Sequence, residues 1–299
     1  MDYPRFAVAL ATHNGLQWLD EQLDTVLSQQ GVEVVVFVSD DSSVDDTVAH
    51  IRDRAMEDKR IVLLPQVSLA GGAAQNFFRL VRDIDLTDFD YLALADQDDC
   101  WCDDKLLRAH LMMHQQFADA YSSNVTAFWP DGRERLLDKA QAQRRWDFLF
   151  EAAGPGCSYV FSVQVGRQLQ AFITQHRSAI ANVILHDWLF YAYVRSAQFN
   201  WYIDSRSGLR YRQHSSNQLG ANSGWRTGYK RLRMIRNGWY RNQALHIARL
   251  CGLGATPFVR HALGGHWWSS LYLLLHINST RRRMRDRLVL GLSCLLHLF

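Results

Sequence analysis

The amino-acid sequence predicts an α/β protein with a mostly parallel sheet flanked by helices. Short apolar runs rich in strand formers alternate with segments whose apolar residues recur at helical spacing, which is typical of βαβ units. The runs are continuous rather than alternating, as in strands that are buried on both faces. This pattern covers residues 6–117 of the 299, and the chain is long enough for one large domain or two small ones.

The predicted elements follow one another in a regular order. Ser42, Ser43 and Asp45 stand before the second helix and favour its N-cap, and Asp103 and Asp104 are expected to cap the fourth. The expected elements are strand 6–12, helix 16–29, strand 32–39, helix 44–56, strand 61–64, helix 73–81, strand 91–95 and helix 106–117.

Three polar clusters stand where predicted strands end. Thr12 to Asn14 follows the first strand, Asp40 and Asp41 follow the second, and Asp96 to Asp99 follows the fourth. In open α/β sheets, ligands bind outside the carboxyl ends of the strands. The sequence therefore predicts one ligand site built from all three clusters.

The third cluster concentrates negative charge. Asp96, Asp98 and Asp99 lie within four residues, and carboxylates this close repel one another unless a cation or a proton intervenes. Mg²⁺ and Mn²⁺ prefer oxygen ligands and share their coordination with substrate phosphates. A single D-x-D is also common in helix-capping turns, so the prediction of a metal depends on the neighbouring acids at the same sheet edge.

A set of ordered segments resembles a known enzyme family. The chain is similar to GT-A glycosyltransferases of the inverting family 2, and most similar to bacterial rhamnosyltransferases that build lipopolysaccharide core or O-antigen. The resemblance covers about residues 5–220 and implies the Rossmann-like GT-A sheet. It rests on the segments VALATHNGLQWLDEQLDTVLSQ, VSDDSSVDDT, GGAAQNF, LADQDDCWCDDKL, ILHDW and YRQH.

The resemblance implies a nucleotide pocket beside a metal site. Asp98 would hold Mg²⁺ or Mn²⁺ on the diphosphate, with Asp96 facing the ribose or the metal and His214 completing the ligand set. One carboxylate of the Asp40–Asp41 pair would hydrogen-bond a pyrimidine base. The implied nucleotide-binding residues are Thr12, Asn14, Asp40, Asp41, Gly72, Asn76 and Asp96.

The resemblance also implies a catalytic base, Asp187. Its apolar neighbours in LHDWLF are expected to raise its proton affinity, which suits a base, although a helix N-cap is the ordinary alternative. His186 and Trp188 flank this acid and are predicted to bind the acceptor, and a core position is the equal alternative for Trp188. A surface position is the alternative for His214.

The C-terminal part is strongly basic. From Arg206 onward the sequence has 16 Lys and Arg and one acid, whereas residues 1–205 have 17 and 29. Apolar runs at 267–277 and 288–299 bracket a basic cluster at 281–287, and each is shorter than the ~20 residues that span a bilayer. We expect a helix lying on an anionic membrane, with a packed helix hairpin or a homodimer contact as alternatives.

These observations predict a catalytic domain over 1–220, with a nucleotide-sugar half over about 1–105 and an acceptor half over about 106–220, and a basic helical region over 221–299. The five cysteines lack zinc-finger spacing and form no disulfide framework, and the first residues lack a secretory pattern. We therefore expect a cytoplasmic enzyme, peripheral on the inner face of the membrane.

The predicted function is metal-dependent transfer of L-rhamnose from dTDP-L-rhamnose to a lipopolysaccharide core or O-antigen acceptor. The alternative donor is a UDP-hexose. A nucleotidylyltransferase is disfavoured because ATHNGLQW contains no Arg or Lys, and a non-enzymatic membrane scaffold remains a separate class. The basic region contains no aromatic-basic recognition motif, so nucleic acid is not an expected partner.

Overall fold

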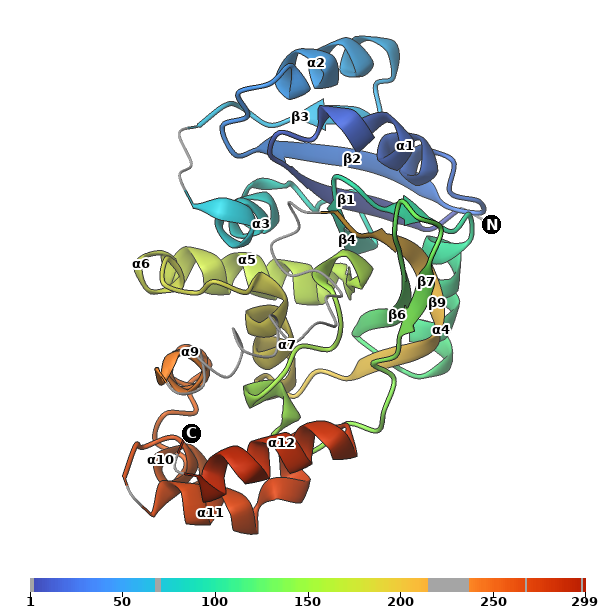
Figure 1. Ribbon diagram of the computed structural model, residues 1–299. Helices are drawn as coiled ribbons and strands as arrows, with labels where there is room; N and C mark the ends of the chain where they lie inside the picture. Colours follow the sequence, from blue (N-terminus) through green and yellow to red (C-terminus); the bar gives the residue numbers. More distant parts are fainter. Residues whose placement is uncertain (1–2, 68–70, 215–236, 267, 297) are drawn as a thin grey trace. The chain divides into compact units, whose positions relative to one another are not determined.

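The computed structural model describes residues 3–67, 71–214, 237–266, 268–296 and 298–299 (Figure 1). By its internal contacts, the chain divides into two compact units. The first comprises Met1–Ala140, Gly154–Asp187 and Phe199–Asn217, and the second comprises Gln141–Ala153, Trp188–Gln198 and Gln218–Phe299.

The strands of the described residues form one mixed sheet in the first unit, in the order β3-β2-β1-β4-β8-β6-β9-β5, with β7 paired to β6. β1 (Arg5–Thr12) is parallel to β2 (Glu33–Asp40) and β4 (Tyr91–Asp96), and β2 is parallel to β3 (Ile61–Leu63). The remaining strands are β5 (Cys100–Trp101), β6 (Ala120–Phe128), β7 (Glu134–Leu137), β8 (Val160–Ser162) and β9 (Trp201–Arg212), and only the β6–β9 pair among them is parallel.

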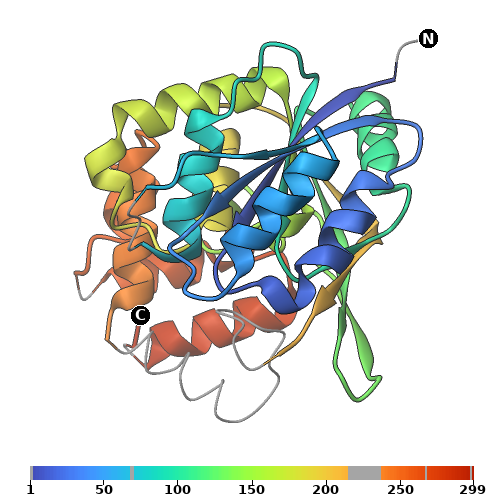
Figure 2. The ribbon, with the colours of Figure 1, turned by 90° about the horizontal axis from the view of Figure 1, so that it is seen from above.

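Helices cover both faces of the parallel strands (Figures 1 and 2). α1 (Leu16–Leu27) and α2 (Thr47–Glu57) lie on one side, and α3 (Gly72–Asp83) and α5 (Val163–Gln175) lie on the other. Side chains of α1 at helical spacing are fully buried against alternate side chains of β1, because successive strand residues point to opposite faces. The residues that share this buried core are Leu19, Leu23 and Val26 on the helix and Phe6, Val8 and Leu10 on the strand.

The predicted α/β class is confirmed, and the eight elements expected over 6–117 are present with small shifts of their ends. The largest shift is at α2, which begins at Thr47 and not at Val44. Ser42 has a positive φ of 60°, and the Asp45 side chain accepts a hydrogen bond from the Thr47 N–H at 3.1 Å, so these residues form a turn before the helix. Asp104 takes the N-cap position of α4 (Lys105–Gln115) without a capping hydrogen bond, because its carboxylate pairs with Arg206 at 2.7 Å.

The second unit is helical in its described residues. Its C-terminal part contains α9 (Trp239–Leu250), α10 (Pro257–Ala262), α11 (Ser269–Leu275) and α12 (Met284–Leu295), with α11 packed against α12. None of the helices in the described part of the chain combines the length and the apolarity that crossing a bilayer requires. The second unit also includes residues 141–153 and 188–198, which belong to the predicted catalytic domain over 1–220. The predicted domain boundary at residue 220 stays a prediction.

A buried ion-pair cluster joins the start of the second unit to its end. The Arg282 guanidinium is fully buried and lies 3.1 Å from an Asp147 oxygen and 3.6 Å from a Glu151 oxygen. Asp147 also accepts hydrogen bonds from Tyr191 Oη at 2.9 Å and from Arg195 at 3.2 Å. One arginine of the basic cluster at 281–287 is therefore part of the core.

Candidate active site

The register of the parallel strands brings the three polar clusters to one edge. Thr12 on β1 is paired with Asp40 on β2, and Ala11 is paired with Asp96 on β4. The ends of the three strands are therefore neighbours, as the sequence predicted. Each following loop starts from the same edge of the sheet and adds its side chains to one site.

The two acids after β2 differ in their hydrogen bonding. Asp40 is buried and accepts hydrogen bonds from Thr12 Oγ1 at 3.0 Å and from the N–H and Oγ of Ser43 at 2.8 and 2.5 Å. Asp41 accepts one from the Gly72 N–H at 2.8 Å through Oδ2, and its buried Oδ1 has no partner in the described ranges. Of the pair, Asp41 thus has the carboxylate oxygen that remains available to a ligand.

Asn76 and Asn14 both fix backbone at this edge. The Asn76 amide is buried and donates hydrogen bonds to the carbonyls of Ser39, at 2.8 Å, and Thr12, at 3.3 Å. Asn14 has a positive φ of 48°, and its side-chain oxygen accepts a hydrogen bond from the Val44 N–H at 2.8 Å. These contacts shape the walls of the predicted nucleotide pocket.

Gln97, between two of the acids, ties the β4 loop to the β1 loop. Its Oε1 accepts a hydrogen bond from the His13 N–H at 2.7 Å, and its Nε2 donates one to the His13 carbonyl at 3.0 Å. Gly15 is required beside it, since a Cβ there would lie 2.2 Å from Gln97 Oε1. The sequence did not single out Gln97, because a lone glutamine forms no distinctive pattern.

The acids after β4 crowd together with few compensating charges. Oxygens of Asp96 and Asp99 and the Cys157 sulfur lie within 4.8 Å of one another. Burial raises the pKa of Asp96 to about 7, and the charges of Asp98 and Asp187 add to the effect, against a hydrogen bond from Cys157. Burial and the charges of Asp96 and Asp98 likewise raise the pKa of Asp99 well above its usual value.

The chemistry of this donor set fits a hard divalent cation held by oxygen. Burial and the nearby charges of Asp99 and Asp96 raise the pKa of the Cys157 thiol, so the sulfur stays protonated. A protonated thiol is a poor ligand for Mg²⁺ or Mn²⁺, whereas carboxylates are good ones. Cys157 therefore serves in hydrogen bonding with the acids, and the carboxylates are the groups that could hold such an ion.

The end of β9 brings His214 to the acids. The Arg212 N–H donates a hydrogen bond to Asp99 Oδ1 at 3.2 Å, and its Nε donates one to the Asp98 carbonyl at 2.9 Å. Two residues later, His214 Nε2 lies 2.6 Å from Asp98 Oδ2. The structure thus brings together the two predicted ligands Asp98 and His214 from distant parts of the sequence.

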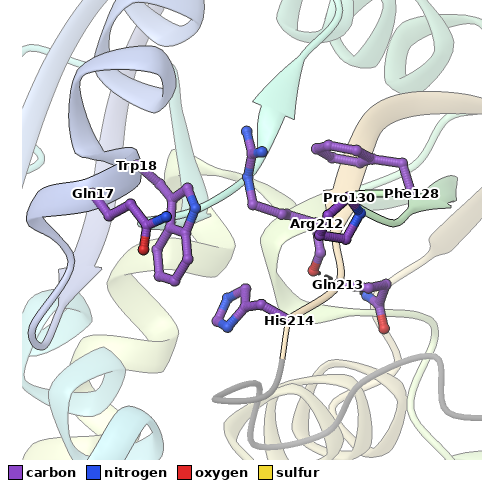
Figure 3. A pocket seen from close by; sticks show the side chains of 7 residues that line it. All are labelled: Gln17, Trp18, Phe128, Pro130, Arg212, Gln213 and His214. Carbon is purple, nitrogen blue, oxygen red and sulfur yellow. Dashed lines mark hydrogen bonds between the residues drawn. The ribbon is translucent and has the colours of Figure 1, made fainter. Parts of the chain in front are cut away.

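A cavity of about 410 Å³ opens beside this pair (Figure 3). The His214 ring stacks on the Trp18 indole with ring centres 4.1 Å apart. Figure 3 shows Trp18 and Phe128 on opposite sides of the cavity, with the Arg212 side chain between them. Its lining residues are Gln17, Trp18, Phe128, Pro130, Arg212, Gln213 and His214.

Lys105 is a buried cation close to the acids. Its Nζ lies 3.3 Å from the centre of the Trp101 ring and has no hydrogen-bond acceptor in the part of the chain that the structure describes. Burial lowers its pKa to about 7, and the neighbouring Cys157 and Asp99 act in the opposite direction. In the sequence Lys105 stands just before the helix predicted over 106–117, and no pattern there indicates that it is buried.

Asp187 stands in the first turn of α7 (His186–Ser196), half-buried, and its backbone carbonyl accepts a hydrogen bond from Tyr159 Oη at 3.3 Å. Its charge contributes to the raised pKa of Asp96, which indicates that the predicted base and the acidic cluster share one site. His186 stacks on Phe77 with ring centres 4.1 Å apart. Burial lowers its pKa to about 3, so the ring is neutral at pH 7.

Trp188 occupies the core of the second unit, which is the alternative to acceptor binding. It is buried, its Nε1 donates a hydrogen bond to the Phe148 carbonyl at 2.9 Å, and its ring stacks on Tyr240 at 5.1 Å. A helix turning by about 100° per residue places neighbours on different sides, so Trp188 does not share the surroundings of Asp187. The prediction that Trp188 binds the acceptor is therefore withdrawn.

Comparison with known proteins shows the family of this chain. The model of glycosyl transferase family 2 matches residues 7–158. The chain is 40% identical over 291 residues to the dTDP-rhamnosyl transferase RfbG of Shigella flexneri. The alignment covers 97% of this chain and 100% of that protein. The chain belongs to glycosyltransferase family 2. It is therefore an enzyme of glycosyl transfer, and the predicted family is confirmed.

Solved structures support the fold of this family 2 enzyme. The Staphylococcus aureus protein TarS, residues 1–349 in complex with UDP, matches with a TM-score of 0.58 and 12% identity, covering 98% of this chain and 92% of that one. The mannosyltransferase PcManGT of Pyrobaculum calidifontis, in complex with GDP-Man and Mn²⁺, matches with a TM-score of 0.52 and 15% identity, covering 99% and 81%. At these identities the likeness shows the GT-A-like fold alone, and it confirms the fold class.

Proposed function

We propose that this glycosyltransferase transfers L-rhamnose from dTDP-L-rhamnose to a lipopolysaccharide core or O-antigen acceptor, with inversion at the anomeric carbon. The near full-length relative that is named a dTDP-rhamnosyl transferase supports the donor. The mechanism is supported by the segment 157–159: Cys157 lies within 4.8 Å of oxygens of Asp96 and Asp99, and Tyr159 Oη donates a hydrogen bond to the Asp187 carbonyl, so the proposed base stands near the proposed diphosphate site. The acceptor follows from the resemblance to lipopolysaccharide enzymes.

In the proposed donor complex, the base of the nucleotide lies against Asp41. Its Oδ1 is buried without a partner in the described residues, and a buried acceptor gains most from a ligand N–H such as that of thymine. Asp40, Thr12 and Asn76 hold the strand ends in place through their own hydrogen bonds. The Gly72 N–H fixes the Asp41 carboxylate through its other oxygen.

The acids Asp96, Asp98 and Asp99 with His214 would hold Mg²⁺ or Mn²⁺ on the donor diphosphate. Such an ion neutralises the charge that develops on the leaving diphosphate. Burial and then the repulsion between the acids raise the pKa values of Asp96 and Asp99, and a divalent cation would relieve that repulsion. Arg212 holds the backbone of this loop in position through its bonds to Asp98 and Asp99.

Asp187 would take the proton of the acceptor hydroxyl. At the same time the hydroxyl oxygen would form a bond to the anomeric carbon, and the bond from that carbon to the diphosphate oxygen would break. General base catalysis of this kind contributes ~10²–10⁴-fold. The neutral His186 ring would orient the acceptor beside the base.

In place of Trp188, we propose that the half-buried Trp18 provides the flat apolar surface on which a sugar ring packs. Trp18 lines the cavity beside His214.

We further propose a cytoplasmic enzyme that works on the inner face of the membrane, where a lipid-linked acceptor would be found. The excess of basic over acidic residues from Arg206 onward supports an anionic surface as partner. A homodimer remains a second option for the C-terminal helices.

A donor screen with the purified enzyme tests this function. We expect turnover with dTDP-L-rhamnose and a truncated core acceptor, and much less with UDP-glucose, UDP-galactose or UDP-N-acetylglucosamine. Calorimetry should show that dTDP affinity falls with EDTA and returns with Mg²⁺ or Mn²⁺. Equal use of a UDP-hexose would remove the rhamnose assignment, and metal-independent affinity would remove the role of the acids.

Two variants separate the base from the nucleotide pocket. Asp187→Asn should lower kcat by about 10²–10⁴-fold and leave dTDP affinity unchanged. Asp41→Asn should lower dTDP affinity, because an amide cannot accept both hydrogen bonds. Asp53→Asn, an exposed acid on α2, is the matched control and should change neither quantity. Full activity of Asp187→Asn would contradict the proposed base.

A further inference from the structure

α12 exposes the apolar side of its sequence. Its exposed positions fall within an arc of about 140° at 3.6 residues per turn. Only Arg285 in this arc is charged, and its side chain is 79% exposed. The apolar members of the arc, with the C-cap residue included, are Met284, Leu288, Val289, Leu292, Leu295 and Leu296.

The side of α12 that faces the protein is less apolar than the side that faces solvent. Its buried residues are Leu290, Gly291, Ser293 and Cys294, and Ser293 Oγ donates a hydrogen bond to the Val289 carbonyl at 2.9 Å. A surface helix of a globular protein ordinarily turns its apolar side to the core. The reversed arrangement here indicates that the outer side of α12 has a partner.

α11 continues the same surface. Leu271 and Leu275 are one helical turn apart and both exposed, and α11 lies beside α12 within this unit (Figure 1). The eight apolar side chains of the two helices are between 55% and 76% exposed. Contiguous exposed apolar patches of this kind mark interaction sites. We call these eight residues and Arg285 the C-terminal face.

Charge distinguishes the candidates for that partner. Over residues 237–299, which include both helices of the C-terminal face, the sequence has eight arginines and one acid, Asp286. In a dimer through this face, the arginines around the C-terminal face of one copy would lie near those of the other copy, and their repulsion opposes association. An anionic lipid surface attracts these arginines, and the acyl boundary of the bilayer accepts the leucines.

The structure also limits which arginines can contact such a surface. The Arg282 side chain is fully buried in its ion pairs, and Arg281 donates a hydrogen bond to Tyr240 Oη at 2.5 Å. Arg287 donates to the carbonyls of Arg281 and Arg282 at 3.1 and 3.3 Å. Arg282 is therefore neutralised by buried carboxylates, and Arg281 and Arg287 are held against the protein, so the exposed apolar residues of the C-terminal face are expected to provide most of the contact.

We propose that the C-terminal face lies in the interface of an anionic bilayer, with the leucines of α11 and α12 at the acyl boundary and Arg285 at the lipid phosphates. This specifies the membrane partner and rests on the proposed function only for the location of the acceptor. It replaces adsorption through the whole 281–287 cluster by shallow insertion of one face.

Vesicle flotation of the full chain tests this proposal. Vesicles of phosphatidylcholine alone and of phosphatidylcholine with phosphatidylglycerol serve as probes. Leu288→Gln/Leu292→Gln should weaken partitioning at least about tenfold on both vesicles, since burial of each leucine is worth a large factor. Arg285→Gln should weaken it about fivefold, and only on vesicles with phosphatidylglycerol.

A matched control uses exposed apolar residues outside this unit. Met56→Gln/Leu111→Gln, on α2 and α4, should partition like the wild type, and circular dichroism should show that every variant is folded. The proposal would be overturned if Leu288→Gln/Leu292→Gln partitioned like the wild type, or if the wild type bound neither kind of vesicle. A wild-type dimer that this variant makes monomeric would also overturn it, because the face would then be covered by a second copy.

The outcome for the membrane is separable from that for the donor. Transfer to a soluble truncated acceptor should be the same in the wild type and in Leu288→Gln/Leu292→Gln. Vesicle binding without use of dTDP-L-rhamnose would remove the proposed donor and leave the membrane contact in place.

Discussion

Arg282→Leu should destabilise the helical unit far more than the replacement of neighbouring arginines. The substitution removes the bonds from the guanidinium to Asp147, at 3.1 Å, and to the Ala152 carbonyl, at 2.6 Å, and leaves the Glu151 carboxylate without its cation. Breaking a buried ion pair by removing one partner costs about 3–5 kcal/mol. Because Asp147 retains Arg195, we expect a loss of about 3 kcal/mol in the free energy of unfolding.

Urea unfolding followed by circular dichroism measures this loss, and Arg285→Leu is the matched control. Arg285 is exposed and its ion pair with Asp286, at 3.4 Å, lies at the surface, so its replacement should cost no more than about 0.5 kcal/mol. Arg282→Lys should fall between the two, because lysine keeps the charge and loses the fork of donors. An equal loss in Arg282→Leu and Arg285→Leu would refute the reasoning.

Three further predictions concern the first unit. Burial holds the pKa of His186 at about 3, against ~6.5 in the unfolded chain, so protonation of the unfolded state lowers stability as the pH falls from 6.5 towards 3. Between pH 7 and pH 5, the free energy of unfolding measured by urea titration should therefore fall by about 1–2 kcal/mol less in His186→Gln than in the wild type. Gly15→Ala should cost about 1–2 kcal/mol, because its Cβ displaces Gln97 from His13, and calorimetry should show weaker dTDP binding. Asp98→Asn should weaken dTDP affinity when Mn²⁺ is present and leave it unchanged in EDTA.

Each of these predictions has its own control. For His186→Gln, a loss of stability between pH 7 and pH 5 equal to that of the wild type would contradict a buried neutral imidazole. In a Gln97→Ala background, Gly15→Ala should cost less than in the wild type, and strict additivity would contradict the proposed clash. For Asp98, an equal loss of affinity with and without Mn²⁺ would indicate a purely structural role.

The N-terminal half of the fold was predictable because its signals are local. Continuous apolar runs and helical spacing located the strands and helices up to residue 117, and their parallel order followed from the alternation. The insertion of β8 between β4 and β6, and the pairing of β5 with β9, depend on contacts between distant segments. No local pattern encodes those pairings.

The site was predictable to the extent that its residues follow strands. Asp41 and Asp98 stand directly after β2 and β4, so their location followed from the sheet. The predicted role of Trp188 depended on whether its indole is buried, which periodicity does not determine around a helix start. The structural role of Arg282 could not be predicted because its partner Asp147 is remote in the sequence.

The paired hydrogen bonds of Gln97 with His13 have a thermodynamic consequence. The loop that carries the acids and the loop that contributes to the base pocket are fastened to each other, so an occupant that orders one also orders the other. Such cooperation is reciprocal by necessity: whatever factor the proposed cation adds to nucleotide affinity, the nucleotide returns to the cation. One neutral amide that joins the two loops would then set how strongly the two proposed ligands depend on each other.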